Sequence, residues 1–133
     1  MTLIDSNVLL DIFTQDPKWW DWSLMRLEEA ALRGTLLIND VIYGETSVRF
    51  RSNDDFDATL ARVDVTVAPM PRLALFLAGK AFTQYRNAGG NRTGVLPDFF
   101  IGAHATVERI PLLTRDARRY RRYFPTVALI APE

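Results

Sequence analysis

The sequence predicts an α/β fold built around a parallel sheet. Short apolar runs with the length of buried strands alternate with longer stretches in which apolar residues recur at helical spacing. Strands and helices that alternate in this way form parallel βαβ units with right-handed crossovers. The 133 residues, 48% hydrophobic and 24% charged, are enough for one hydrophobic core. We therefore expect a single α/β domain over residues 1–133.

The apolar runs predict five strands. Thr2-Leu3-Ile4 is a very short first strand that Asp5 ends, and Leu36-Leu37-Ile38 is the second. The third strand is indicated by the alternation of apolar and polar residues. The complete expected set is residues 2–4, 36–38, 64–67, 110–113 and 126–130.

Proline, glycine and capping residues delimit the expected helices. The first helical stretch breaks near Asp16-Pro17 and ends before Gly34, which is a good C-terminal stop. Asn39 or Asp40 caps the next helix, and Ser52 opens a turn and a new cap. We expect helices that end at about Arg33, Phe50 and Arg62, and helices over about 71–87, 98–108 and 116–123. Three glycines in residues 88–95 predict a mobile loop.

The composition excludes several classes of function. The formal net charge is zero, so a nucleic-acid partner would have to be held by a local patch. The chain has no cysteine, which removes disulfides, thiol catalysis and cysteine-based zinc sites and fits a reducing compartment. The N-terminus lacks the basic region of a signal peptide, and no apolar run reaches the roughly 18 residues of a membrane span. We expect a cytoplasmic protein without a membrane partner.

Four acidic residues fall where this fold would gather them at one edge of its sheet. Asp5 and Asp116 come just after expected strands, Glu45 follows the second strand by about two helical turns, and Asp98 opens a helix after Pro97. Parallel sheets bind ligands beyond the carboxyl ends of their strands, where the strand order reverses. If the first and fourth strands are neighbours, Asp5 and Asp116 face one another and the other two acids lean in.

Helix capping is the alternative role for three of these acids. Asp5, Asp98 and Asp116 each precede or open an expected helix, and a cap is worth about 1 kcal/mol. For each of them alone, capping is the simpler interpretation. Glu45 has no such role, because it lies inside a mostly apolar helix where a lone glutamate would usually face solvent. The occurrence of all four on one side of an alternating α/β chain favours a shared site.

A divalent cation is the usual reason to gather carboxylates that would otherwise repel one another. Magnesium and manganese prefer oxygen ligands, and a bound ion activates water and neutralises charge on a phosphate. Metal-dependent phosphodiester chemistry is therefore the leading hypothesis, and its candidate catalytic and metal-binding residues are Asp5, Glu45, Asp98 and Asp116. Histidine is not needed, and we expect His104 to be a packed or partly exposed side chain on nearly the opposite face from Asp98.

Neutral and basic neighbours extend the candidate site. Ser6 and Asn7 could bond a metal-bound water or a phosphate oxygen, although Asn7 could instead cap a helix. Thr114 offers a hydroxyl either to the site or to a local turn. Five arginines in the eight residues 115–122 indicate either a solvated helix face or phosphate contacts beside the acids. The candidate phosphate contacts are Arg92, Arg115, Arg118 and Arg119.

Four segments in order resemble the acidic motifs of PIN-domain nucleases. Leu-Ile-Asp-Ser-Asn-Val-Leu-Leu-Asp at 3–11 is similar to the first motif, and Ile-Tyr-Gly-Glu at 42–45 to the second. Leu-Pro-Asp-Phe-Phe-Ile-Gly-Ala-His-Ala at 96–105 is similar to the third, and Leu-Leu-Thr-Arg-Asp-Ala-Arg-Arg-Tyr at 112–120 to the fourth. The ending Tyr-Phe-Pro-Thr-Val-Ala-Leu-Ile-Ala-Pro resembles the tail of VapC-type toxins. The four acids match the pattern, and Ser6 stands where many members have threonine.

The resemblance implies a fold, an activity and partners. It implies a three-layer α/β/α sandwich and a magnesium- or manganese-dependent endoribonuclease that leaves 5′-phosphate and 3′-hydroxyl ends. The four acids would hold the metal, Thr114 would support the site, and the candidate phosphate contacts would bind RNA. The implied partners are RNA, a second copy of the chain, and a VapB-type antitoxin that lays its C-terminal segment across the acids and inserts an arginine or lysine.

Three alternatives stay open on the sequence. A haloacid-dehalogenase-like phosphatase also has an early Asp after its first strand, but its second acid would fall where this chain has Asn7. A receiver domain would need a strand-end lysine that the chain lacks. A catalytically inactive PIN-like module that only binds protein or RNA would have no use for four buried acids.

Overall fold

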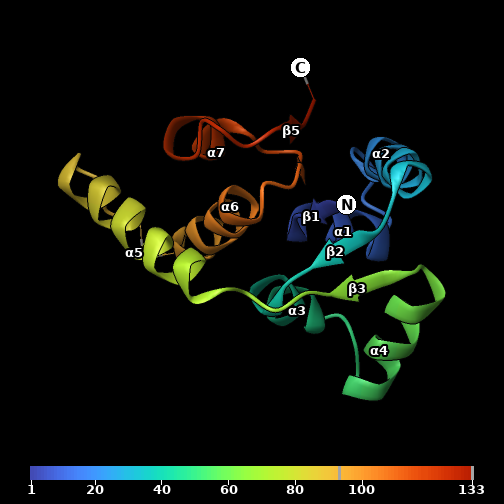
Figure 1. The fold of residues 1–133 in the computed structure, drawn as a ribbon. Coiled ribbons are helices and arrows are strands. Elements are labelled where there is room, and N and C mark those ends of the chain that lie inside the picture. Colours follow the sequence, from blue (N-terminus) through green and yellow to red (C-terminus); the bar gives the residue numbers. More distant parts are fainter. Residues whose placement is uncertain (93, 133) are drawn as a thin grey trace.

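The computed structural model describes residues 1–92 and 94–132 and contains one five-stranded sheet (Figure 1). The strand order is β3-β2-β1-β4-β5, and every neighbouring pair is parallel. The strands are β1 Thr2–Ile4, β2 Leu36–Ile38, β3 Val65–Val67, β4 Leu112–Leu113 and β5 Leu129–Ile130. The expected parallel α/β fold is therefore confirmed, with β1 in the centre of the sheet.

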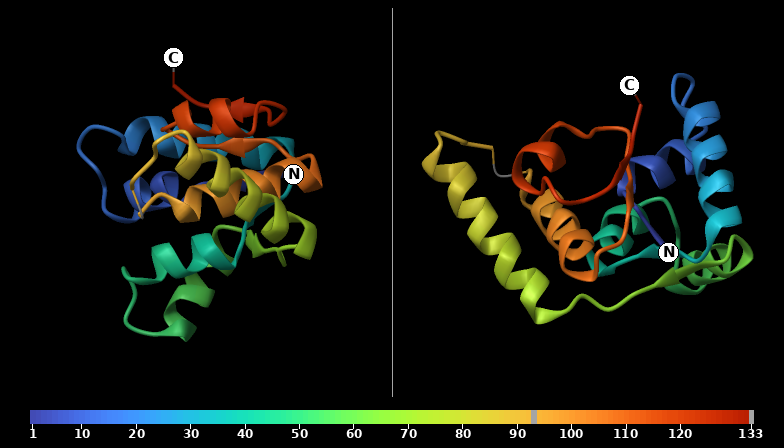
Figure 2. Two further views of the ribbon diagram at one scale, coloured as in Figure 1. Left: turned by 90° about the vertical axis from the view of Figure 1, so that its left-hand side faces the viewer. Right: turned by 45° about the horizontal axis from the view of Figure 1, so that its top comes forward.

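Helices cover both faces of this sheet, which makes the expected three layers. Helices α5, α6 and α7 lie on one side, and α2 and α4 lie on the other (Figure 1). Helices α5 and α6 run side by side in every view (Figure 2). The helices are α1 Ser6–Phe13, α2 Trp20–Arg33, α3 Asp40–Ser47, α4 Asn53–Arg62, α5 Arg72–Asn87, α6 Leu96–Glu108 and α7 Arg118–Tyr123.

Two helix starts differ from the expectation, and both differences concern an acid of the candidate site. Helix α6 begins at Leu96, with a proline in its first turn, so Asp98 lies inside the helix and does not cap it. Helix α7 begins at Arg118 with Ala117 before it, so Asp116 does not cap α7. Asp5 does cap α1, because its carboxylate accepts a hydrogen bond from the backbone N–H of Ser6. Capping therefore accounts for only one of the four acids.

Other sequence signals act where they were expected. The Asn39 side chain caps α3 by accepting from Ile42 N at 3.0 Å, and the Ser52 hydroxyl caps α4. Gly34 follows α2. The segment expected to be a mobile loop, 88–95, separates α5 from α6, and its residue 93 lies outside the described part of the chain. No helix among the described residues is long and apolar enough to cross a membrane.

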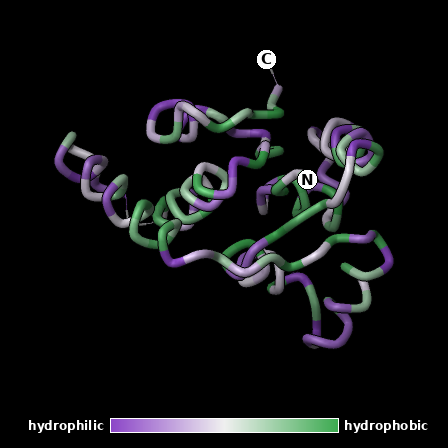
Figure 3. Tube along the Cα trace, in the orientation of Figure 1, coloured by the Kyte–Doolittle hydropathy of each residue, from purple (hydrophilic) through white to green (hydrophobic). Residues whose placement is uncertain are grey.

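The strands and α6 contribute many of the fully buried apolar side chains of the core, and the other helices add to it. Leu3, Ile4 and Leu112 are fully buried in the sheet, and Phe99 and Ile101 are fully buried on α6. The hydropathy of the chain follows this arrangement, with hydrophobic segments along the central strands and in α6 (Figure 3). Each fully buried large side chain of this kind stabilises the fold by roughly 1.5–3 kcal/mol.

The sheet order places a ligand-binding edge beside β1. The chain passes from β1 to β2 through helices on one face and reaches β4, the other neighbour of β1, through helices on the opposite face. The strand order therefore reverses between β1 and β4, which is where open parallel sheets leave a crevice at their carboxyl edge. The first and fourth strands are neighbours, which the sequence alone could not establish, and Asp5 and Thr114 follow them directly.

Close packing between α6 and the residue that follows α7 makes one glycine indispensable. A Cβ atom at Gly102 would lie 2.3 Å from the ring of the buried Phe124. We expect Gly102→Ala to lower the free energy of unfolding by about 1–3 kcal/mol through overpacking. Gly79→Ala is the matched control, because a Cβ there meets open space on α5. The control should be neutral or stabilising by about 0.5–1 kcal/mol. Equal unfolding midpoints in urea for the two variants would contradict this packing.

Candidate active site

The centre of the candidate site is the carboxylate of Asp5 at the end of β1. Asp5 is only 4% exposed. Its Oδ1 accepts from Ser6 N at 2.7 Å, and its Oδ2 accepts from the Thr114 hydroxyl at 2.8 Å and the Tyr120 hydroxyl at 2.9 Å. The three donors come from the start of α1, the end of β4 and α7. They fix the orientation of a carboxylate that water barely reaches.

Glu45 enters the site from the middle of α3. Its carboxylate accepts a hydrogen bond from the Ser6 hydroxyl at 2.6 Å, and the residue is only partly exposed. A glutamate in an apolar helix is thus turned toward the sheet edge and not toward solvent. Ser6 therefore links two of the predicted acids, since its N–H binds Asp5 and its hydroxyl binds Glu45.

The other two predicted acids, Asp98 and Asp116, reach the site from α6 and from the turn after β4. Asp98 lies in the first turn of α6, and its Oδ2 accepts from the Arg119 guanidinium of α7 at 2.5 Å. Asp116 lies in the turn between β4 and α7, where its side chain is 59% exposed and 3.9 Å from Arg118. Its backbone N–H donates to the Thr114 hydroxyl at 3.1 Å.

All four predicted acids line one cavity of about 330 Å³, which we call the acid cavity. Ser6, Asn7, Arg115 and Tyr120 also contribute to its wall. Within residues 1–92 and 94–132, no three acidic or histidine side chains are grouped closely enough to hold a metal ion as they stand. The acids share one cavity, but Ser6 and Arg119 currently hold Glu45 and Asp98 in hydrogen bonds of their own.

Burial gives these acids an unusual affinity for protons. Burial, followed by the nearby charge of Asp98, raises the pKa of Asp5 from 3.8 to about 7, although its three hydrogen bonds oppose the shift. Burial also raises the pKa of Glu45, and it raises the pKa of Asp98 in spite of Arg119. Positive charge in the acid cavity would therefore stabilise the ionised form of three of its carboxylates.

Thr114 is the junction of the hydrogen bonds around Asp5. It is fully buried, donates to Asp5, and accepts from Asp116 N two residues later, so it serves both the site and a local turn. Asn7 lies inside α1 and caps no helix. Its Nδ2 donates to the Thr114 hydroxyl at 3.2 Å, and its Oδ1 accepts from Arg115 N at 3.3 Å. Thr114 and Asn7 together tie the end of β4 to the start of α1.

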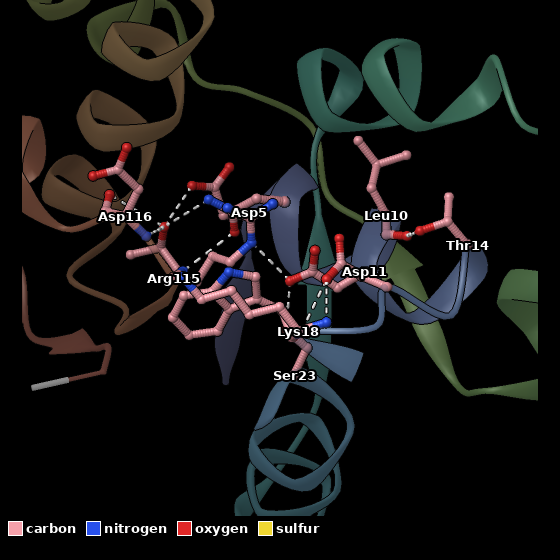
Figure 4. A network of polar contacts seen from close by, with 12 residues as sticks. Asp5, Leu10, Asp11, Thr14, Lys18, Ser23, Arg115 and Asp116 are labelled. Atoms are coloured by element: carbon pink, nitrogen blue, oxygen red, sulfur yellow. Dashed lines mark hydrogen bonds and ion pairs between the residues drawn. The ribbon is translucent and has the colours of Figure 1, made fainter. Parts of the chain in front are cut away.

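The buried acid Asp11 holds Arg115 beside the acid cavity (Figure 4). Asp11 is 2% exposed, and its Oδ2 accepts from Arg115 Nε at 2.8 Å and from the Ser23 hydroxyl at 2.7 Å. The Arg115 guanidinium also lies 5.6 Å from the centre of the Trp19 ring. Two predicted phosphate contacts, Arg115 and Arg119, are therefore paired with acids of the chain itself.

Sequence reasoning missed two residues of this site. Tyr120 is 1% exposed, and burial near Asp5 raises its pKa well above 10, so the phenol remains a donor. It ends the segment that resembles the fourth acidic motif, but a tyrosine among arginines gave no signal of its own. Asp11 could have been found, because it lies between the apolar pairs Leu9-Leu10 and Ile12-Phe13. Like Glu45, it is an acid inside an apolar helical stretch.

His104 does not belong to the site. The side chain is 1% exposed, and its Nδ1 lies 3.0 Å from the Asn39 Nδ2. Burial lowers its pKa, so the ring stays neutral inside the fold. The expectation of a packed side chain is confirmed.

The donor set of the acid cavity fits a hard divalent cation. Its wall offers the carboxylates of Asp5, Glu45, Asp98 and Asp116, and carboxylate oxygen is the ligand that magnesium and manganese prefer. Burial is the first cause of the raised pKa values of Asp5, Glu45 and Asp98, and positive charge in the acid cavity would offset it. A cation supplies that charge where a neutral ligand does not.

The strand order, the reversal beside β1 and the acid cavity together define an α/β domain with an oxygen-donor site at the carboxyl edge of a parallel sheet. The PIN domain model matches residues 2–125, and the chain therefore belongs to the PIN domain family. This confirms the resemblance seen in the four acidic motifs. It also removes the dehalogenase-like phosphatase and the receiver domain as alternatives.

Solved structures with the same fold include three complexes. VapBC2 from Rickettsia felis bound to a DNA fragment from their promoter gives a TM-score of 0.73 at 17% identity, over 99% of this chain and 98% of that chain. DNA-bound VapBC from Salmonella typhimurium gives 0.69 at 14%, over 98% and 96%. A toxin–antitoxin complex from Klebsiella pneumoniae gives 0.66 at 18%, over 100% and 98%. At these identities the likeness shows the fold alone. No curated protein matches the sequence.

The buried Asp5 makes stability depend on pH. Because its pKa is raised from 3.8 to about 7, the folded chain keeps a proton that the unfolded chain has released between these values. The free energy of unfolding therefore falls as pH rises through this window. Asp5→Asn removes this loss. Without metal, the free energy of unfolding of the variant should therefore rise relative to that of the wild type from pH 4 to pH 8, by roughly 4 kcal/mol at most.

Urea unfolding in EDTA at several pH values checks this expectation. Asp64→Asn is the control, because Asp64 is an exposed turn residue with φ 56°, a conformation that asparagine tolerates. The difference in free energy of unfolding between Asp64→Asn and the wild type should not change over the same pH range. A difference between Asp5→Asn and the wild type that is equally flat would contradict the raised pKa of Asp5.

Proposed function

We propose that the chain is a metal-dependent endoribonuclease and the toxin of a toxin–antitoxin pair. The observation that supports this best is the acid cavity, where carboxylates from four separate segments meet at the carboxyl edge of the sheet. The membership of the PIN domain family gives a nuclease fold. The reaction proposed is hydrolysis of an RNA phosphodiester bond that leaves 5′-phosphate and 3′-hydroxyl ends.

The residues proposed to hold magnesium or manganese are Asp5, Glu45, Asp98 and Asp116. When bound, the ion would lower the pKa of a water molecule and neutralise charge on the phosphate. Thr114 and Tyr120 hold Asp5 in one orientation, and Ser6 does the same for Glu45. Asp98 would have to release Arg119 to serve as a ligand, because one carboxylate oxygen is engaged by that guanidinium.

The proposed protein partners are a VapB-type antitoxin and a second copy of the chain. The structures with the same fold are toxin–antitoxin complexes, which motivates the antitoxin. The antitoxin is proposed to inhibit the chain by inserting an arginine or lysine among the four acids. The pairing of Arg119 with Asp98 supports this, because the rim of the acid cavity already accepts a guanidinium. An arginine from an antitoxin would meet the same electrostatic demand as the metal.

The second candidate function is a catalytically inactive PIN-like module that binds RNA or protein. The observation that favours it is the same ion pair, since Arg119 already compensates one of the four acids. A module of this kind would keep Asp98 paired, and it would show neither metal binding nor cleavage. The raised pKa values of Asp5 and Glu45 favour the nuclease, because these two acids have no cation partner among the ion pairs of the described residues.

Cleavage of total RNA by the chain freed of any antitoxin is the direct test. We expect cleavage with magnesium or manganese and none with EDTA. Asp98→Asn should lower the rate on the order of 100-fold or more, because even the outer partners of metal ligands cost 10–100-fold when mutated. Asp64→Asn is the charge-matched control and should cleave like the wild type. Cleavage by Asp98→Asn at the wild-type rate would contradict the proposed site.

Metal binding has a readout that does not depend on cleavage. Because a cation relieves the repulsion and desolvation of the carboxylates, millimolar magnesium or manganese should raise the melting temperature by about 5–10 °C. Asp5→Asn should reduce the rise, since it removes the most buried ligand. If neither magnesium nor manganese changes the melting temperature of the wild-type chain, the result would favour the inactive module.

A further inference from the structure

A second and larger cavity, of about 650 Å³, adjoins the acid cavity. We call it the arginine pocket, because Arg92, Arg118, Arg119 and Arg122 line it together with Tyr85 and Tyr123. Its lining residues come from α5, from the segment before α6, from the first turn of α6, from the turn after β4 and from α7. Asp98 and Asp116 line both cavities, so the two share a wall.

Three packed aromatic rings lie beside the arginine pocket, and two of them line it. Tyr85 of α5, the fully buried Phe99 of α6 and Tyr123 of α7 form one aromatic cluster, in which the ring centres lie 5.2–6.1 Å apart. Gly90 packs against the Tyr85 ring so closely that a Cβ would lie 2.5 Å from it, and Arg92 N donates to the Tyr85 hydroxyl at 3.2 Å. These contacts tie the backbone of Arg92 to Tyr85, and both residues line the pocket.

The charges of the arginine pocket are unbalanced in favour of the arginines. Four guanidiniums face two carboxylates. Arg119 is paired with Asp98, whereas the 92% exposed Arg118 is 3.9 Å from Asp116. Arg122 lies over the Tyr123 ring, 5.4 Å from its centre, and forms no ion pair in the described part of the chain. In a chain without net charge, this local excess has to serve an anionic group.

We propose that the arginine pocket binds the phosphate group of the nucleotide next to the phosphodiester bond that is cleaved in the acid cavity. The proposal rests on the proposed nuclease function and names the subsite that holds the RNA strand. Planar guanidiniums bind phosphate with two parallel hydrogen bonds. A strand with its scissile phosphate at Asp98 and Asp116 reaches the arginine pocket directly, because these acids form the shared wall.

Arg119 connects the two cavities. Its guanidinium lies 2.5 Å from the proposed metal ligand Asp98, whereas Arg118 lies 3.9 Å from Asp116, so Arg119 forms the closer of the two pairs. If Asp98 were neutralised by a cation, the Arg119 guanidinium would be free to bind the phosphate beside it. Arg118 is 92% exposed and its pair with Asp116 is long, and Arg122 forms no ion pair among the described residues, so these two arginines supply the binding that can be measured before metal is added.

The test is binding of a fluorescein-labelled oligoribonucleotide of mixed sequence to the chain in EDTA, followed by anisotropy at several salt concentrations. Arg118→Ala with Arg122→Ala should weaken binding about 10-fold or more. It should also lower the magnitude of the slope of log K against log salt by about 1.4, since each phosphate contact to a single strand contributes roughly 0.7. Arg62→Ala with Arg121→Ala is the control, because it removes equal charge from exposed positions outside both cavities.

The outcomes separate this proposal from the proposed function. If both double variants bind alike, the arginine pocket is not the subsite, even when the wild type cleaves RNA. Competition by a deca-glutamate peptide as effective as that by unlabelled RNA would also overturn the proposal, in favour of an acidic peptide ligand. In the cleavage assay, Arg118→Ala with Arg122→Ala should raise KM with little change in kcat, whereas Asp98→Asn should lower kcat. Loss of kcat alone in the arginine variant would contradict a binding role.

Discussion

Asp5 ends the central strand with a carboxylate that is 4% exposed, and an ionised group at that depth is costly unless donors or positive charges surround it. The neighbouring elements are arranged around this demand. Helix α1 presents the N–H of Ser6, β4 presents Thr114, and α7 presents Tyr120. These three hydrogen bonds do not remove the cost, because the pKa of Asp5 is still raised to about 7. The remaining demand is for positive charge.

The chain meets the same demand at other acids with its own arginines. Asp11 is fully compensated by Arg115 and Ser23 and helps to fix the turn after β4. Asp98 is paired with Arg119, but its carboxylate is partly exposed at the rim of a cavity. A ligand cation could therefore replace Arg119 as its partner. Asp5 and Glu45 receive only hydrogen-bond donors. This gradient, from closed ion pair to carboxylate without a cation partner among the described residues, is the basis for proposing that Asp5 and Glu45 serve a ligand and that Asp11 is structural.

The fold was predictable from the sequence because its strands are apolar runs bounded by strong breakers. Several predicted boundaries were wrong: α3 ends at Ser47 and not near Phe50, and the last two strands are shorter than expected. Two helix starts were wrong because capping was assumed for an acid: Asp98 lies within α6, and Asp116 precedes α7 without capping it. The four acids could be found because each interrupts an apolar pattern or follows a strand. The pairing of Arg115 with Asp11 and of Arg119 with Asp98 could not be found, because it depends on how the turn after β4 lies against α1 and how α7 packs against α6. Tyr120 was missed for the same reason.

The measurement that tests this account most directly is the titration of the Asp5 carboxyl carbon by NMR, assigned with Asp5→Asn and recorded without metal and with magnesium. The account predicts a midpoint near pH 7 in the metal-free chain, set by burial and the charge of Asp98, and a midpoint far lower when magnesium is present. A metal-free midpoint near 4 that magnesium leaves unchanged would contradict it. In that case the carboxylate would already be satisfied, and the acid cavity would have no need of a cation.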